Sequence, residues 1–381
     1  MRASRGERFA PTVCWAECRF MDANSQVQPG LVQPGPVGTR EIPPEVDFVY
    51  VMRRDSDYVA AQFAGRLGLE ERVEEIRELY DRYVDDLARH VLQAFATRYV
   101  HPAVDLLSSR EIHQRRLELA SSLGPATLVS MDPLMEEGAL PLAFSRCYAL
   151  GGETLMEMIP RPGCAPLASQ VTDIVTAASG GPLVVIEDDF FTGETLERVL
   201  GKQLGPLMDD VIGVVPGTKV GPRELSFPVL PAVRYRCSDD ASPLDKVDLG
   251  DPRDFIVGVS GLVCRLGSGA LGRLPYVLPF VSPAARASLP RGAESEFSRR
   301  ALELSRNFYE ELEELGRRTV VLDDSDPAFA RACIELLGVD GGTSMARVLD
   351  ATATRGADLV GLADASHVSP TGETRTAQPR G

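Results

Sequence analysis

Lysine is almost absent from this chain of 381 residues. Its 40 basic residues are arginines except for Lys202, Lys219 and Lys246, and 55 acidic residues bring the net charge to −15. Nucleic acids and anionic lipids attract proteins through clustered positive charge, so this composition argues against either as a partner. An anionic ligand would have to be bound by arginines, by main-chain amides or together with Mg²⁺.

Long apolar runs and regularly spaced metal-ligating residues are also lacking. No stretch approaches the roughly 18 apolar residues of a membrane span, and residues 1–21 contain no apolar signal segment. The seven cysteines show no disulfide or zinc-site spacing, and the four histidines lie far apart. We therefore expect a cytoplasmic protein that has no membrane segment, no histidine metal cluster and no catalytic triad.

The composition divides the chain into four parts. Residues 1–42 include the sequence QPGLVQPGPVG, residues 351–381 are polar, and we expect both segments to be disordered. Residues 43–222 predict an α/β domain with a helical N-terminal part. Residues 223–350 predict an α+β extension that would act as a hood or subdomain.

Short apolar runs alternate with helical patterns in the middle of the chain. The expected strands are residues 126–131, 153–159, 182–186 and 210–215, and the expected helices are residues 138–150, 167–179 and 192–204. Such alternation is typical of βαβ units, so it predicts an open, mainly parallel sheet flanked by helices. In the N-terminal part we expect a strand at 46–52 and helices over 69–100 and 108–124.

The expected hood is less regular. It contains two expected strands, at 254–266 and 273–281, a helix over 294–316 and a small αβ unit over 318–338. The sequence GSGALG, residues 267–272, matches the dinucleotide-binding pattern, but Pro275 follows where the binding helix should run. This segment therefore predicts a hairpin turn.

One segment combines adjacent acidic residues with a turn that carries hydroxyl groups. In PLVVIEDDFFTGETLERVL, residues 182–200, three acidic residues follow a run of aliphatic ones directly. Ligands of open parallel sheets bind at the carboxyl ends of strands, and adjacent carboxylates there must meet hydroxyls, cations or water. The following Thr192, Gly193, Glu194 and Thr195 supply two hydroxyls, a flexible backbone and the first amides of a helix, which suit a phosphate monoester. The segment therefore predicts a site for a phosphorylated sugar.

The pattern E-D-x-x-x-T-G-x-T-L, from Glu187 to Leu196, resembles the signature of the type I phosphoribosyltransferases, which use 5-phosphoribosyl-1-pyrophosphate (PRPP). The resemblance implies that Glu187 and Asp188 contact the ribose 2- and 3-hydroxyls and that residues 192–195 hold the 5-phosphate. It covers residues 125–220. By position, it places the pyrophosphate loop within 127–147 and the mobile catalytic loop at 158–166.

Three residues depart from the pattern of that family. Asp189 replaces an aliphatic residue, Phe191 stands where purine-using members often have an acid, and Glu194 brings negative charge beside the phosphate turn. Phe191 disfavours an ordinary purine acceptor. We expect Asp189 and Phe191 to line the substrate site at the positions where this protein differs most from members of the family.

The resemblance implies a Mg²⁺-dependent phosphoribosyltransferase with PRPP and an unidentified acceptor as substrates. Glu187, Asp188 and Arg161 would be catalytic, Asp188 would also be a ligand of Mg²⁺, and Asp132 would help bind the substrate. Position 191 lacks the acid of purine-using members, and the chain carries a large C-terminal extension. Both features favour an acceptor from a specialised biosynthetic pathway. The sequence leaves open whether the protein forms a homodimer.

Other interpretations compete with this hypothesis. A non-catalytic protein that senses PRPP or a nucleotide would use the same residues. Residues 187–196 are also compatible with a plain helix start capped by Thr192, Asp132 with a solvated acidic loop, and Arg161 with an ordinary loop arginine.

Overall fold

The computed structural model describes residues 31–32, 38–132, 134, 138–150, 154–191, 201, 205–222 and 225–354. In this part of the chain the largest element is an open sheet of six parallel strands, in the order β2-β11-β10-β9-β5-β6. The strands are β2 (Thr39–Ile42), β5 (Thr127–Ser130), β6 (Leu140–Pro141), β9 (Leu183–Phe190), β10 (Val211–Lys219) and β11 (Val233–Cys237). The predicted open parallel sheet is confirmed.

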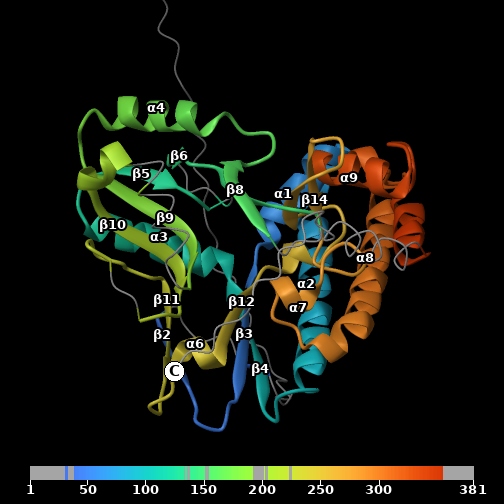
Figure 1. Ribbon diagram of the computed structural model, residues 1–381, viewed down its shortest axis with the longest axis horizontal. Helices are drawn as coiled ribbons and strands as arrows, with labels where there is room; N and C mark the ends of the chain where they lie inside the picture. The colour runs from blue at the N-terminus through green and yellow to red at the C-terminus, as the bar shows by residue number, and fades with distance from the viewer. Residues whose placement is uncertain are drawn as a thin grey trace, which may run out of the picture.

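Helices cover both faces of this sheet (Figure 1). Helix α4 (Leu167–Ala178) packs against one face through Ile174, and α3 (Ser109–Ser122) packs against the other through Ala120. The central strand β9 has strand neighbours on both sides, and its four aliphatic residues are fully buried. Parallel strands covered on both faces carry such unbroken apolar runs, which explains why the sequence predicted this strand clearly.

A second parallel sheet was not predicted. Its order is β1-β4-β3-β12, with β1 (Leu31–Val32), β3 (Phe48–Arg54), β4 (Pro102–Ser108) and β12 (Val247–Gly250). We expected only one strand in the N-terminal part. Strand β4 lacked an obvious pattern because Asp105 interrupts it; this carboxylate is buried and accepts a hydrogen bond from the Tyr235 hydroxyl at 2.6 Å.

Part of the segment expected to be disordered is ordered. Residues Thr39–Ile42 form an edge strand that pairs with β11, whose residues lie almost 200 positions later in the chain. So distant a partner leaves no local signal in the sequence. Residues 345–354 are helical although a disordered tail was expected from 351, while 1–30, 33–37 and 355–381 lie outside the described residues.

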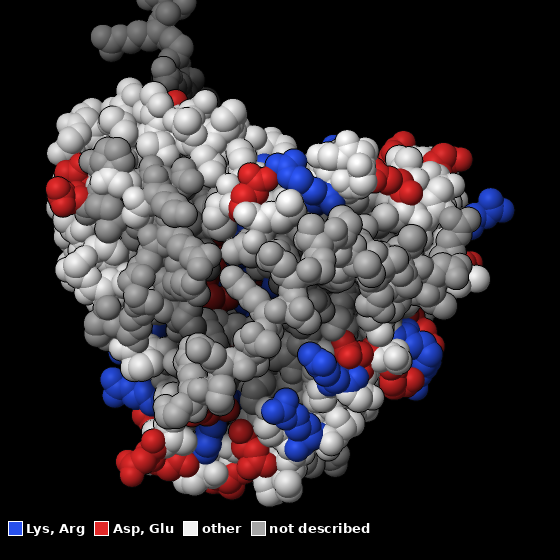
Figure 2. All heavy atoms as spheres, viewed as in Figure 1, with Lys and Arg blue, Asp and Glu red and all other residues white. Residues whose placement is uncertain are grey.

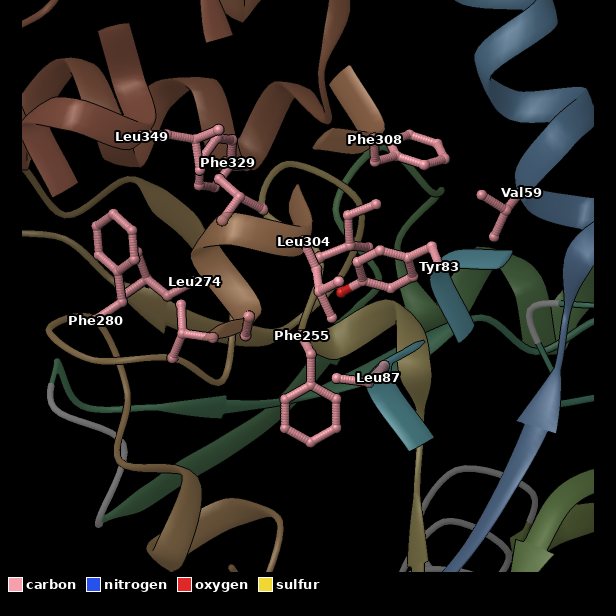
Figure 3. Packing of buried hydrophobic residues seen from close by; sticks show 14 of the residues in the cluster. Val59, Tyr83, Leu87, Phe255, Leu274, Phe280, Leu304, Phe308, Phe329 and Leu349 are labelled. Carbon is pink, nitrogen blue, oxygen red and sulfur yellow. The ribbon is translucent and has the colours of Figure 1, made fainter. Parts of the chain in front are cut away.

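The second sheet supports a large helical core in the other half of the molecule (Figures 1 and 3). It contains α1 (Ser56–Leu67), α2 (Val73–Phe95), α8 (Glu294–Gly316) and α9 (Pro327–Leu337). Helices α2 and α8 confirm the helices predicted over 69–100 and 294–316. Phe308 of α8 packs with Phe63 at 5.1 Å and Tyr83 at 6.0 Å between ring centroids, so aromatic contacts join the N-terminal helices to the C-terminal part.

A third sheet corrects two expectations. It has the order β14-β13-β7-β8, with β7 (Phe144–Tyr148), β8 (Leu155–Pro160), β13 (Leu262–Arg265) and β14 (Leu271–Leu274). The helix predicted over 138–150 is wrong, because these residues form β6 and β7. Strand β8 was predicted, but it runs antiparallel to β7 in this third sheet instead of joining the main sheet.

In the segment 223–350, β11 and β12 join the two parallel sheets, and the two strands predicted for the hood are shorter than expected. Only Leu262–Arg265 and Leu271–Leu274 are strands within the two predicted segments; the predicted GSGALG hairpin between them is confirmed. Val321 makes only an isolated bridge to Ser344 in place of a strand. The shorter helices are η1 (Glu70–Arg72), η2 (Gly205–Asp210), α6 (Pro243–Lys246), η3 (Pro252–Asp254), α7 (Pro283–Arg286), η4 (Arg291–Ala293) and η5 (Leu322–Asp324). None of the described helices is sufficiently long and apolar to span a bilayer.

Candidate functional site

The six-stranded sheet reverses its strand order between β5 and β9. The chain leaves β5 towards β6, returns to form β9 on the other side of β5, and continues away through β10 and β11. Pairing of β5 with β9 stops at Ser130 and Ile186, whereas β9 continues beside β10 as far as Phe190. A crevice therefore opens beyond β5, at the position where open α/β sheets bind ligands.

A pocket of about 200 Å³ lies in this crevice, between the main sheet and the third sheet. It is lined by Met131, Phe144, Ser145, Arg146, Tyr148, Arg161, Glu187, Asp188, Gly261, Leu262, Val263 and Tyr276. Figure 2 shows acidic side chains deep in the hollow between the two halves of the molecule. The sequence predicted Glu187, Asp188 and Arg161 here, and the fold brings all three together.

Glu187 is the least satisfied polar residue of this pocket. It is 8% exposed, its Oε1 accepts the main-chain N–H of Asp188 at 3.1 Å, and its buried Oε2 has no hydrogen-bond partner among the described residues. Burial, and then the adjacent Asp188 carboxylate, raise the pKa of Glu187 well above its ordinary value. An unpaired buried carboxyl oxygen is costly, so a hydroxyl or a cation from a ligand would stabilise it.

Asp188 is half-buried and completes a carboxylate pair on the pocket wall. Its Oδ1 accepts the N–H of Asp189 at 2.7 Å. The described residues contain no cluster of three or more metal-ligating side chains. Two carboxylates nevertheless fit Mg²⁺, which commonly takes one or two protein carboxylates and completes its shell with substrate oxygens and water.

Both carboxylates stand inside β9, which runs four residues past its expected end at Ile186. The extension depends on Gly217 of β10, directly opposite Asp188. A Cβ atom at this glycine would lie 2.6 Å from the Asp188 carbonyl oxygen, which is too close for any other residue without displacement of β9. Gly217 therefore allows the two strands to approach where the acids enter the pocket.

Asp132 follows β5, but its carboxylate is fully engaged inside the protein. It pairs with Arg53 at 2.9 Å and with Arg116 at 2.6 Å, and it accepts the N–H of Leu134 at 2.8 Å. These arginines overcome the cost of burial and lower the pKa of Asp132. Arg116 also donates to the Glu187 carbonyl at 3.2 Å, so it ties the ends of β5 and β9 together.

Sequence reasoning missed Arg53 and Arg116. A signal for Arg116 existed, because it lies four residues after Ile112 and four before Ala120, the buried positions of α3. An arginine in the apolar stripe of a helix indicates a buried acidic partner. Which acid it would meet was not encoded locally.

Asp189 and Phe191 do not line the pocket. Asp189 lies opposite Thr218 of β10 and is exposed. Phe191 is half-buried and packs against the apolar cluster that contains Val220. The structure thus gives Phe191 a packing role. The predicted phosphate turn, Thr192, Gly193, Glu194 and Thr195, lies outside the described residues.

Two arginines and two tyrosines complete the pocket. Arg161 follows β8 and donates to the Met131 carbonyl at 3.2 Å, while Arg146 extends from β7 as an exposed residue. Tyr148 and Tyr276 stand on the side of the hood. The pocket thus combines carboxylates for hydroxyls or a cation, guanidinium groups for phosphate oxygens, and aromatic surface.

Comparison of the chain with family models, curated proteins and solved structures finds no match. The chemistry of the pocket is therefore inferred from its own residues.

Proposed function

We propose that this protein is a phosphoribosyltransferase whose donor, PRPP, binds in the crevice between β5 and β9. The phosphoribosyl group would pass to an unidentified acceptor with release of pyrophosphate. The observation that carries the proposal is the buried, unpartnered Oε2 of Glu187, beside Asp188, in a pocket at the switch point of the sheet. A vicinal diol would supply the donors that this pair of carboxylates lacks.

The volume of the pocket supports a sugar as the innermost group. About 200 Å³ is below the roughly 300–1,000 Å³ typical of sites for whole drug-sized ligands. A pentose ring fits this space, and the pyrophosphate and acceptor would extend towards the open side. Arg161 and Arg146 lie on the same pocket, so their guanidinium groups would bind the pyrophosphate.

In the proposed reaction the bond between the anomeric carbon and the pyrophosphate oxygen breaks, and a bond from the acceptor to that carbon forms on the opposite face. Positive charge develops on the ribose meanwhile. Glu187 and Asp188 would orient the ring and stabilise this charge, since fixed groups aimed at developing charge lower the barrier. Bound Mg²⁺ would neutralise the leaving pyrophosphate, and Glu187 and Asp188 are the residues that would hold it.

The acceptor would stand against the hood. Tyr148, Tyr276 and Leu262 line the same pocket as the carboxylates, and aromatic and apolar groups there suit a planar acceptor better than a simple amine or water. Purine-using members of the family often have an acid at the position of Phe191. Because Phe191 packs in an apolar cluster, this protein has no hydrogen-bonding side chain at that position. Both features support an acceptor from a specialised biosynthetic pathway.

Calorimetric titration with PRPP and Mg²⁺ tests the proposal. Asp188→Asn and Glu187→Gln should each weaken binding by roughly 10- to 100-fold, the value of a hydrogen bond to a charged group. Asp173→Asn, an exposed site on α4, is the matched control and should bind as the unaltered protein does. Absence of PRPP binding, or equal affinity in all four proteins, would refute the site.

Pyrophosphate release separates an enzyme from a sensor. Release that depends on an added acceptor and is lost in Asp188→Asn supports the transferase. Tight PRPP binding with no release across a broad set of planar acceptors would favour the non-catalytic sensor.

A further inference from the structure

A second, larger cavity lies at the carboxyl edge of the four-stranded parallel sheet. Its volume is about 510 Å³, inside the roughly 300–1,000 Å³ range of small-molecule sites. It is lined by Asp55, Asp57, Tyr58, Ser109, Arg110, His113, Arg116 and Leu134. Nothing in the proposed transfer reaction uses this cavity.

The cavity occupies a position suited to ligands. Strand β3 leads through Asp55 into α1, and β4 leads into α3. Helix α1 packs in the core on one face of this sheet, whereas α3 packs with the cluster on the other face. The cavity therefore lies between α1 and α3, beyond the carboxyl ends of the parallel strands β3 and β4, where open α/β sheets take their ligands.

Helix α3 lines the cavity with basic side chains. Arg110, His113 and Arg116 follow one another at intervals of three residues, so they lie on one side of the helix. Arg110 is 70% exposed and pairs at 3.4 Å with Asp57, which is itself 61% exposed. Exposed pairs of this kind contribute little, so the Arg110 guanidinium can turn to a ligand at small cost.

The acidic residue at the base of the cavity does not oppose an anion. Asp55 is buried, and it accepts from Ser109 at 2.5 Å and pairs with Arg53 at 2.8 Å and Arg253 at 3.1 Å. Arg53 and Arg253 thus neutralise Asp55, and each of them also pairs with a second acid, Asp132 or Asp251. Asp57, at the surface, is already the partner of Arg110 and would be displaced from it.

The rest of the lining is apolar or aromatic. The guanidinium of Arg253 lies 5.3 Å from the centre of the Tyr58 ring, which fixes the ring beside the cavity. Leu134 contributes an aliphatic surface. A ligand held here would therefore have a charged end near α3 and a planar or apolar body against Tyr58 and Leu134.

We propose that this cavity binds a phosphomonoester with a planar ring, about the size of a mononucleotide. Arg110 and His113 would bind the phosphate, and Tyr58 would pack against the ring. The two cavities share no lining residue. Arg116, which lines the second cavity, donates to Asp132 and to the carbonyl of Glu187, which lines the first. The inference is independent of PRPP as the donor.

Adenosine 5′-monophosphate is the probe for calorimetric titration, with adenosine as the ligand that lacks the phosphate. The double variant Arg110→Gln/His113→Gln removes both proposed phosphate contacts. Arg115→Gln is the matched control, because Arg115 stands on the same helix, pairs at 2.9 Å with the exposed Glu118 and does not line the cavity. Arg116 is left unchanged since it supports both pockets.

We expect adenosine monophosphate to bind the unaltered protein and Arg115→Gln equally, and the double variant roughly 10- to 100-fold more weakly. Adenosine should bind all three proteins weakly. Absence of binding, affinity no better than that of adenosine, or unchanged affinity in the double variant would each overturn the proposal. Loss of binding in Asp188→Asn would also overturn it, because the nucleotide would then occupy the first pocket.

Discussion

Asp132→Asn should destabilise the protein strongly. The carboxylate is buried, and it pairs with Arg53 at 2.9 Å and with the buried Arg116 at 2.6 Å. Asparagine keeps the shape but removes the charge, so the buried Arg116 loses this carboxylate and Arg53 loses one of its two, since it also pairs with Asp55 at 2.8 Å. Removing one partner of a buried ion pair costs about 3–5 kcal/mol. The unfolding entropy of about 2.1 cal/mol/K per residue gives about 1.2 °C per kcal/mol for a chain of 381 residues that unfolds as one unit, so the apparent Tm should fall by roughly 4–6 °C.

Thermal and urea unfolding monitored by circular dichroism measure this loss. Asp173→Asn is the control, and its change should stay within about 0.5 kcal/mol because the residue is exposed. The pKa of Asp132 is lowered from 3.8, so its stabilisation is complete above that pH and is lost only on further acidification. The deficit of the variant should therefore be constant from about pH 5 to 8.

The experiment also decides between two roles for Asp132. A residue reserved for substrate or Mg²⁺ would leave the stability of the ligand-free protein nearly unchanged when replaced. A loss below about 1 kcal/mol would refute the structural role argued from the ion pairs. A weakened affinity for PRPP in a variant of unchanged stability would restore the role predicted from the sequence.

Three further outcomes are expected. Glu187→Gln should raise the Tm of the ligand-free protein at pH 8 more than at pH 5: a folded-state pKa above the ordinary 4.5 stabilises at low pH, and the benefit is lost as the pH rises through it. Gly217→Ala should lower the Tm and weaken PRPP binding, because its Cβ would meet the Asp188 carbonyl at 2.6 Å, whereas Gly65→Ala, with open space on α1, should not destabilise. Burial raises the pKa of Asp254 from 3.8 to about 7, so stability should fall across that interval as the pH rises, and less so in Asp254→Asn.

Each of these three predictions would be contradicted by a specific result. Equal Tm differences for Glu187→Gln at the two pH values would show that its carboxyl group is not desolvated in the folded protein. A Gly217→Ala protein as stable as Gly65→Ala would show that the two strands can separate without loss. A pH profile unaltered by Asp254→Asn would assign the loss of stability to other groups.

The local sequence predicted the parts of the fold whose signals are continuous. The aliphatic run before Glu187 predicted the central strand, and apolar periodicity predicted α2 and α8, because burial on defined faces repeats with the period of each element. It failed for residues 138–150, where a short apolar run containing Pro141 satisfies either pattern. These residues form strands because β7 pairs with β8 and β13, and those partners are beside it only in the folded chain.

Some residues of the candidate site could likewise be predicted from the local sequence, and others could not. Glu187 and Asp188 were recognisable because the carboxyl end of a buried strand is a local feature. Arg161 was recognisable because it lies in the loop after the strand predicted at 153–159. The partners of Asp132 were not, since Arg53 is 79 residues away and the Glu187 carbonyl bonded by Arg116 is 71 residues from that arginine. An isolated arginine or aspartate in a sequence specifies the need for a partner but not its identity.

By itself, then, the sequence determined that one buried strand ends in acids and that helices and strands alternate around it. The tertiary structure decided that β5 stops short of those acids and that Tyr148 of β7 and Tyr276 of the hood line the same pocket. It also decided that Asp132 forms buried ion pairs. It also formed the second parallel sheet, and with it the second cavity. Hydrophobic patterning acts through near neighbours along the chain, whereas strand order and buried ion pairs depend on contacts that exist only after distant segments have packed together.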